Sequence, residues 1–320
     1  MANEYSEMHE IWLLNMNDDA QDNETLNLFH DSVYQRIISM ALKNTSLKYG
    51  SPPSPFVFFV MGSAGRKEQS LWSDQDHGMV FTADTSEAQD YFLRLGIEIS
   101  NGLEQSGYQR CTGNVMADNP LWCKSLKQWE KQLDSWVRES SWESIRHLLI
   151  FADARALYGE SYLIATLKER SIEAVKQSNL YTRMLQNTMH IKKGVGLLGQ
   201  FLVETHGSLS GSINLKETAF LPFVNASRLI SFIEENKETT TLLRIKQGDT
   251  CLSFEEKEYF SKSFALLLEF RLHHSDHRDY ESGHYIHVGH LTKQDKKTLK
   301  EILKAAERFY EKIRNLINGM

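Results

Sequence analysis

Residues 56–81 constrain the fold of this chain most, because two apolar runs there enclose a turn and a pair of acids. The first run, 56–61, contains β-branched and aromatic residues and lies between Pro55 and Gly62. This pattern predicts a buried strand. The second run, 78–81, predicts another strand, so the polar residues between the runs connect two strands.

The connecting residues predict a site for a metal ion and a phosphate. Gly62 and Ser63 begin a small-residue turn, which allows the close backbone approach that a phosphate-binding loop requires. Asp74 and Asp76 are two positions apart, and residues so spaced project to the same face of a strand. Two convergent carboxylates repel unless a cation lies between them, and Mg²⁺ prefers such oxygen ligands.

Each of these fragments also has a simpler interpretation. Gly-Ser turns are common, and an Asp-x-Asp pair is more often a solvated strand end or turn. Two other sites are excluded. The turn lacks the Lys-Ser/Thr ending of a P-loop, and an EF-hand beginning at Asp74 would need a ligand at Gly78 and a Glu at Thr85.

Taken together, the stretch GSAGRKEQSLWSDQDHGMVF resembles the nucleotidyltransferase superfamily, whose signature is Gly-Ser followed by Asp-x-Asp on the next strand. It is similar to the GSxGRxEQxxxTDQDN version of the DUF294 family, whose relatives include the GlnD uridylyltransferases. Ser73 and His77 replace the usual Thr and Asn. The matching residues are Gly62, Ser63, Gly65, Arg66, Glu68, Gln69, Asp74, Gln75 and Asp76.

The resemblance implies an α+β fold, in which a small mixed-sheet nucleotidyltransferase domain precedes a mostly helical C-terminal domain. The expected domains are an N-terminal helical segment over residues 1–50, a nucleotidyltransferase domain over 51–160 and a helical substrate-binding domain over 161–320. Apolar residues at helical spacing predict one helix before residue 50 and another between Phe92 and Gly107.

The resemblance also assigns roles. Asp74 and Asp76 are expected to hold one or two Mg²⁺ ions, and Gly62 and Ser63 to contact the phosphates of a nucleoside triphosphate. Arg66 is expected to stabilise charge on the phosphates, because its planar guanidinium suits phosphate oxygens.

A third carboxylate is the open question. A second matching segment, GNVMADNPLW, predicts a third strand at 114–116, yet this strand carries no acid, and Asp118 only follows it. Asp153, in a stretch that resembles FDxRxxxG of the family, is the other candidate and is expected in a helix. An ion pair with Arg155 or another base is the alternative interpretation of Asp153.

The C-terminal half extends the resemblance. Lys216 and Arg228 match a family segment in which Asn214 replaces the usual Asp, and they could reach the triphosphate or an acidic group of the substrate. The alternative interpretation is that both side chains are solvated, as lysine and arginine side chains more often are. Thr292 and Asp295 predict the cap of a long final helix.

Composition and charge limit the kinds of partner that this chain is expected to bind. The net charge of -6 gives no general attraction to nucleic acid or to an anionic membrane, and no apolar run approaches the ~20 residues of a membrane span. The N-terminus lacks a signal-peptide pattern, and the three cysteines, Cys111, Cys123 and Cys251, are interpreted as reduced, buried thiols of a cytoplasmic protein. His273 and His277 are one helical turn apart, a spacing that can bind zinc. The alternative interpretation is that these histidines lie near the C-terminus of a helix, where they interact favourably with the helix dipole.

Three hypotheses follow. The leading one is an enzyme that transfers a nucleoside monophosphate to an acceptor hydroxyl, with a protein acceptor suggested by the resemblance to GlnD. The second is a non-catalytic nucleotide sensor that signals to a regulatory partner, which the missing acid on the third strand favours. The third is a transferase that modifies a small molecule.

Overall fold

The computed structural model describes residue 5 and residues 22–189, 191–276 and 278–320, and it confirms the α+β class. The chain divides into two compact units. Unit 1 comprises Met1–Glu139 and Ile150–Ala174, and unit 2 comprises Ser140–Leu149 and Val175–Met320.

Unit 1 is built around a mixed sheet of four strands in the order β3-β2-β1-β4. The strands are β1 (Phe56–Val60), β2 (His77–Phe81), β3 (Cys123–Ser125) and β4 (Arg155–Gly159). β1 pairs antiparallel with β2 and β4, whereas β2 pairs in parallel with β3. Every residue of β1 and β2 is buried, which explains why both strands appear in the sequence as continuous apolar runs.

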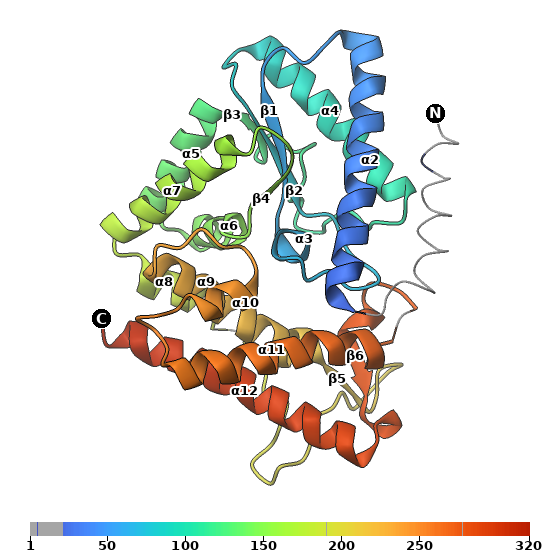
Figure 1. The fold of residues 1–320 in the computed structure, drawn as a ribbon, viewed down its shortest axis with the longest axis vertical. Helices are drawn as coiled ribbons and strands as arrows, with labels where there is room; N and C mark the ends of the chain where they lie inside the picture. The colour runs from blue at the N-terminus through green and yellow to red at the C-terminus, as the bar shows by residue number, and fades with distance from the viewer. Residues whose placement is uncertain (1–4, 6–21, 190, 277) are drawn as a thin grey trace. The chain divides into compact units, whose positions relative to one another are not determined.

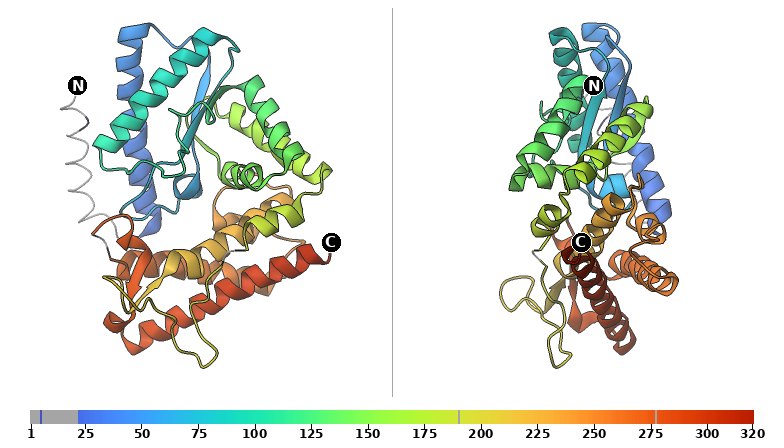
Figure 2. Two further views of the ribbon diagram at one scale, coloured as in Figure 1. Left: turned by 180° about the vertical axis from the view of Figure 1, so that it is seen from behind. Right: turned by 90° about the vertical axis from the view of Figure 1, so that its left-hand side faces the viewer.

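Helices cover both faces of this sheet (Figure 1). The helices of unit 1 are α2 (Asn23–Tyr49), α3 (Gly62–Arg66), α4 (Ser86–Gln105), α5 (Leu126–Glu139) and most of α7 (Tyr162–Gln177). Most of α6 (Trp142–Phe151) belongs to unit 2. α2 and α4 pack side by side on one face, where Phe58 and Phe92 share a core (Figure 2). On the other face, the Phe59 ring lies 5.8 Å from the Trp129 ring and 6.2 Å from the Phe151 ring.

The predicted strand at 114–116 is wrong, because the strand that joins β2 is β3, further along the chain. Asn114 has a left-handed φ of 56°, and its carbonyl accepts a hydrogen bond from the Asn119 side chain at 2.9 Å. These contacts make the segment a turn. Its Val115 carbonyl still accepts from the His77 N–H at 3.0 Å, so the segment borders the sheet.

The expected helix around Asp153 is also wrong. α6 ends at Phe151, the Asp153 N–H donates to the Ile150 carbonyl in a turn, and β4 follows. β4 pairs with β1 across about a hundred residues of chain, and such pairing leaves no local periodicity in the sequence.

Unit 2 is mostly helical, as expected. Its elements are the helices α8 (Tyr181–Asn187), α9 (Leu221–Ile233), α10 (Thr241–Lys246), α11 (Phe254–His274) and α12 (Lys293–Asn318), the π-helix η1 (Lys216–Phe220), the 3₁₀-helices η2 (Ser282–His284) and η3 (Val288–His290), and the antiparallel strands β5 (Ser212–Asn214) and β6 (Tyr285–His287). Phe223 packs against Phe264 and Phe309 in its core. The predicted cap of α12 is confirmed, since Thr292 and Asp295 exchange hydrogen bonds.

Candidate functional site

Asp74 and Asp76 lie just before β2 and alternate with two buried residues. Asp74 forms a parallel bridge with Gln109, and the Gln75 N–H donates to the Gln109 carbonyl at 2.9 Å. Gln75 and His77 are fully buried, whereas both aspartates are partly exposed. Because side chains alternate along an extended chain, the two carboxylates project away from the core on the same side.

A buried hydrogen-bond network of Gln75 and His77 fixes this segment on its core side. The Ala117 N–H donates to His77 Nδ1 at 3.0 Å, so Nδ1 carries no proton and Nε2 donates to Gln75 Oε1 at 3.1 Å. The Gln75 amide in turn donates to the carbonyls of Ser100 and Tyr108. Burial, with a smaller effect of the Arg110 charge, lowers the pKa of His77 to about 3, so the ring stays neutral.

The Gly-Ser turn lies directly against Asp76. β1 ends at Val60, and the Met61 N–H donates to the Asp76 carbonyl at 2.8 Å. Gly62 follows with a left-handed φ of 53°, and a Cβ added there would lie 2.1 Å from Asp76 Oδ2. Glycine is therefore required twice, by its backbone conformation and by the carboxylate beside it. Ser63, the next residue of α3, is partly exposed.

Arg66, at the end of α3, is buried between two acids. Its Nε donates to Glu68 at 2.6 Å and its Nη1 to Asp153 at 2.5 Å. Burial alone would lower the pKa of Arg66, but the charges of Asp153 and Glu68 raise it, so the guanidinium remains a cation. The structure thus places Asp153 in an ion pair that links the turn after α6 to α3.

Cys111, two residues after the bridge partner Gln109, also lies at the site, although no local sequence pattern connects it with the aspartates. The pairing does not continue to residue 111, because the His77 N–H donates to the Val115 carbonyl and the Cys111 carbonyl accepts from the Asn114 N–H in a turn. A carboxylate oxygen of each aspartate and Cys111 Sγ lie within 4.8 Å of one another. Burial and the charge of Asp76, to which the thiol donates, raise the pKa of Cys111 to about 12.

The two candidates for a third carboxylate both pair with arginines. Asp118 pairs with Arg110, as Asp153 does with Arg66. Among the described residues, one group of potential metal ligands contains Asp74 and Asp76, and its third member is Cys111. This group includes neither Asp118 nor Asp153.

Tyr34 of α2 adds an unusual feature near the acids. Its side chain is 1% exposed, and its hydroxyl has no hydrogen-bond partner among the described residues. Burial raises the pKa of Tyr34 well above its ordinary value, and the charges of Tyr108, Asp74 and Asp76 contribute to this increase.

Lys216 belongs to unit 2, at the start of η1. Its ammonium donates to His284 Nε2 at 3.2 Å and to the Tyr280 hydroxyl at 3.4 Å. Burial and then the charge of Lys216 lower the pKa of His284 to about 3. Arg228, on α9, donates to the Asn225 side chain at 3.4 Å.

The histidines at positions 273–290 form no three-residue metal cluster among the described residues. His277, one half of the zinc-spaced pair, lies outside them. His284 contacts Lys216, and the rings of His287 and His290 lie 4.3 Å apart.

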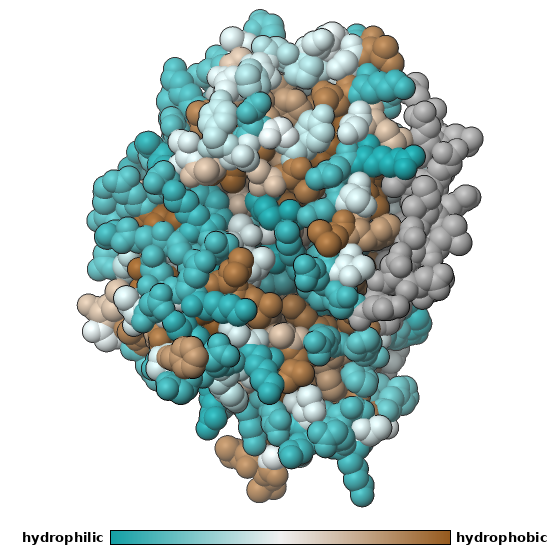
Figure 3. All heavy atoms as spheres, viewed as in Figure 1, coloured by the Kyte–Doolittle hydropathy of each residue, from teal (hydrophilic) through white to brown (hydrophobic). Residues whose placement is uncertain are grey.

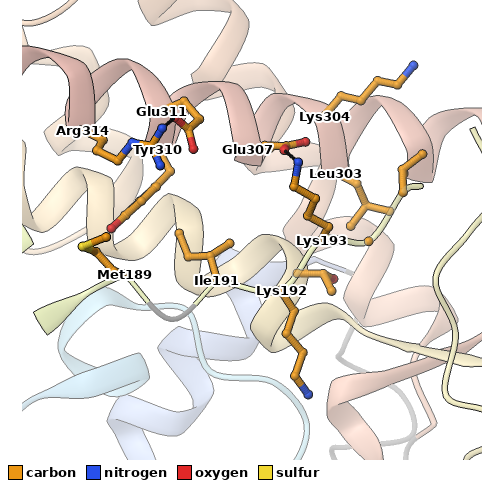
Figure 4. Close-up of a pocket in the computed structure, with 13 residues that line it drawn as sticks. Met189, Ile191, Lys192, Lys193, Leu303, Lys304, Glu307, Tyr310, Glu311 and Arg314 are labelled. Carbon is orange, nitrogen blue, oxygen red and sulfur yellow. Dashed lines mark ion pairs between the residues drawn. The ribbon is translucent and has the colours of Figure 1, made fainter. Parts of the chain in front are cut away.

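Unit 2 also contains a pocket of about 200 Å³ beside α12 (Figure 4). Its cations are largely neutralised by their neighbours. Lys193 pairs with Glu307 at 2.9 Å, and Arg314 pairs with Glu311. Lys192 pairs at 2.7 Å with Glu217 of η1. These ion pairs offset part of the positive charge of the lining, which also includes Lys304.

Two family models match this chain. "Putative nucleotidyltransferase DUF294" matches residues 14–143, which include the Gly-Ser turn, both aspartates and Cys111. "Putative nucleotidyltransferase substrate binding domain" matches residues 178–317. The chain belongs to the DUF294 family. This membership points to nucleotidyl transfer as the class of reaction. A comparison with curated proteins finds no match.

The described part of this DUF294 protein contains no helix with the length and apolar character to cross a membrane. Figure 3 shows a largely hydrophilic face with smaller apolar patches.

Proposed function

We propose that this DUF294 protein transfers a nucleoside monophosphate from a nucleoside triphosphate to an acceptor hydroxyl, in a reaction that depends on Mg²⁺. The observation that carries the proposal is the convergence of Asp74 and Asp76 beside the turn at Gly62 and Ser63.

The residues present fit one or two Mg²⁺ ions. Two carboxylates supply oxygen ligands, and Gly62 leaves room for Asp76 where any side chain would collide with it. Bound Mg²⁺ would neutralise charge on the triphosphate and on the departing pyrophosphate.

The protein's own groups would position the phosphates. The Ser63 hydroxyl and the backbone N–H groups of the turn would donate to phosphate oxygens. Arg66 would stabilise negative charge on the phosphates. Its ion pairs with Asp153 and Glu68 favour an orienting role for Asp153, which would act through Arg66.

The acceptor is proposed to bind unit 2, which the substrate-binding model matches. Lys216 would contribute a cation for an acidic group of the nucleotide or the acceptor, and its position against His284 and Tyr280 would hold it in place. A protein acceptor is the leading candidate through the resemblance to GlnD, and a small molecule is the alternative.

A non-catalytic nucleotide sensor is the second candidate function. It is favoured by the ion pairs of Asp118 and Asp153, which occupy both acids that could serve as a third carboxylate. Such an acid would ordinarily deprotonate the attacking hydroxyl.

Transfer of label separates these candidates. The purified chain is incubated with each α-labelled nucleoside triphosphate and Mg²⁺, with and without cell extract. We expect labelled acceptor from the wild type and from Asp134→Asn, whose side chain forms an exposed ion pair, but not from the Asp74→Asn, Asp76→Asn double variant. Saturable nucleotide binding without transfer would favour the sensor, and absence of both would contradict the proposal.

A further inference from the structure

We propose that Cys111 is a metal ligand whose sulfur, together with Asp74 and Asp76, binds a borderline divalent cation of the Zn²⁺, Co²⁺ or Cd²⁺ class. This inference rests on the proposed function in one respect, namely that the two aspartates form a metal centre. It adds a third protein ligand and a preference among metal ions.

The distances suit a shared ion. Bonds of ~2.0–2.3 Å from zinc to oxygen or sulfur keep two ligand atoms of one ion at most about 4.6 Å apart. The three candidate atoms lie within 4.8 Å of one another before any ion is bound, so small rotations of the side chains suffice. The isolated bridge between Asp74 and Gln109 brings the chain near Cys111 back to the two aspartates.

A further observation indicates that a ligand binds near these groups. The Tyr34 hydroxyl is buried without a hydrogen-bond partner among the described residues, although it is near enough to both aspartates for their charges to raise its pKa. Buried polar groups normally have hydrogen-bond partners, and a group bound to the metal ion would supply a partner for the Tyr34 hydroxyl.

The chemistry of sulfur determines which ion is preferred. Carboxylates alone favour Mg²⁺ or Mn²⁺, whereas a thiolate favours softer ions such as Zn²⁺. On binding, the metal–sulfur bond forms, the S–H bond breaks, and the proton passes to solvent. Cys111 does not form a disulfide, and the two other cysteines, Cys123 and Cys251, are also free and are buried.

Absorption spectroscopy tests the inference on the full chain. Titration of the metal-free protein with Cd²⁺ or Co²⁺ is expected to produce a thiolate-to-metal charge-transfer band that saturates at one ion per chain. Cys111→Ser should abolish the band and weaken Cd²⁺ binding at least about tenfold. Cys251→Ser, the same change at a buried thiol of unit 2, should retain the band. Cys111→Asp should lack the band and bind Mg²⁺ more tightly than the wild type.

Protection from alkylation tests the same claim without a variant. Cd²⁺ is expected to slow the reaction of Cys111 with iodoacetamide, measured by mass spectrometry of the peptide. A wild type without the band and without protection, or a band that persists in Cys111→Ser, would overturn the inference. Transfer of label with Mg²⁺ but no band would overturn the inference alone, whereas a band without transfer would support Cys111 as a ligand and count against the transferase.

Discussion

At the scale of single residues, Gly62 determines where the Asp76 carboxylate can lie. Two separate constraints act on this position. Its φ of 53° is strained for any residue with a Cβ, and the Cβ itself would lie 2.1 Å from Asp76 Oδ2. The first constraint affects stability, and the second affects both stability and the geometry of the site.

Gly62→Ala separates the two constraints when it is compared with Gly207→Ala. Gly207 has a φ of 74°, but a Cβ there would meet nothing within 4 Å. We expect Gly207→Ala to cost about 1–2 kcal/mol of unfolding free energy and Gly62→Ala about 2–5 kcal/mol, because overpacking adds to the strain. Urea unfolding measures both, and equal costs would show that Asp76 does not confine Gly62.

The position of Cys111 beside the aspartates depends on a contact that no local pattern carries. Gly62, Ser63, Asp74 and Asp76 could be proposed from the sequence, because a local motif and strand periodicity contain them. Cys111 could not, since only the fold brings the chain after Gln109 back beside the aspartates.

At the scale of elements, the apolar runs and helical periodicities predicted β1, β2, α2, α4 and α12. The short strands β3 and β4 were not predicted, because they form through pairing with distant strands. The ion pair of Arg66 with Asp153 is another such contact, and it ties α3 to the turn before β4.

Asp153→Asn tests this tie. The change leaves the buried Arg66 cation with one anionic partner fewer, and breaking a buried pair costs about 3–5 kcal/mol. Asp134→Asn is the matched control, because the Asp134–Arg170 pair is about 42% exposed on both sides and should cost at most about 1 kcal/mol. Similar losses of unfolding free energy for the two variants would contradict a structural role for Asp153.

At the scale of the whole molecule, three buried histidines couple stability to pH. Burial is the main cause that lowers the pKa of His30 to about 4 and those of His77 and His284 to about 3. The unfolded chain binds these protons near pH 6.5, whereas the folded chain binds them only near pH 3–4. The unfolded state therefore holds more protons between these values, and stability falls as the pH falls.

His77→Asn should reduce this acid sensitivity. Each buried histidine contributes up to about 1.4 kcal/mol per pH unit in this window, so removal of one should flatten the dependence of unfolding free energy on pH between 6 and 4. Denaturant unfolding at several pH values measures the slope. A slope equal to that of the wild type would mean that His77 is protonated in the folded protein.

The proposed function requires that Asp74 and Asp76 bind a nucleoside triphosphate through a divalent cation. Calorimetric titration with a non-hydrolysable triphosphate tests it most directly, because it requires no knowledge of the acceptor. We expect saturable binding that requires Mg²⁺, is retained in Asp134→Asn and is lost in the Asp74→Asn, Asp76→Asn double variant. Equal binding by the double variant, or binding by the wild type that is indifferent to divalent cations, would contradict the account.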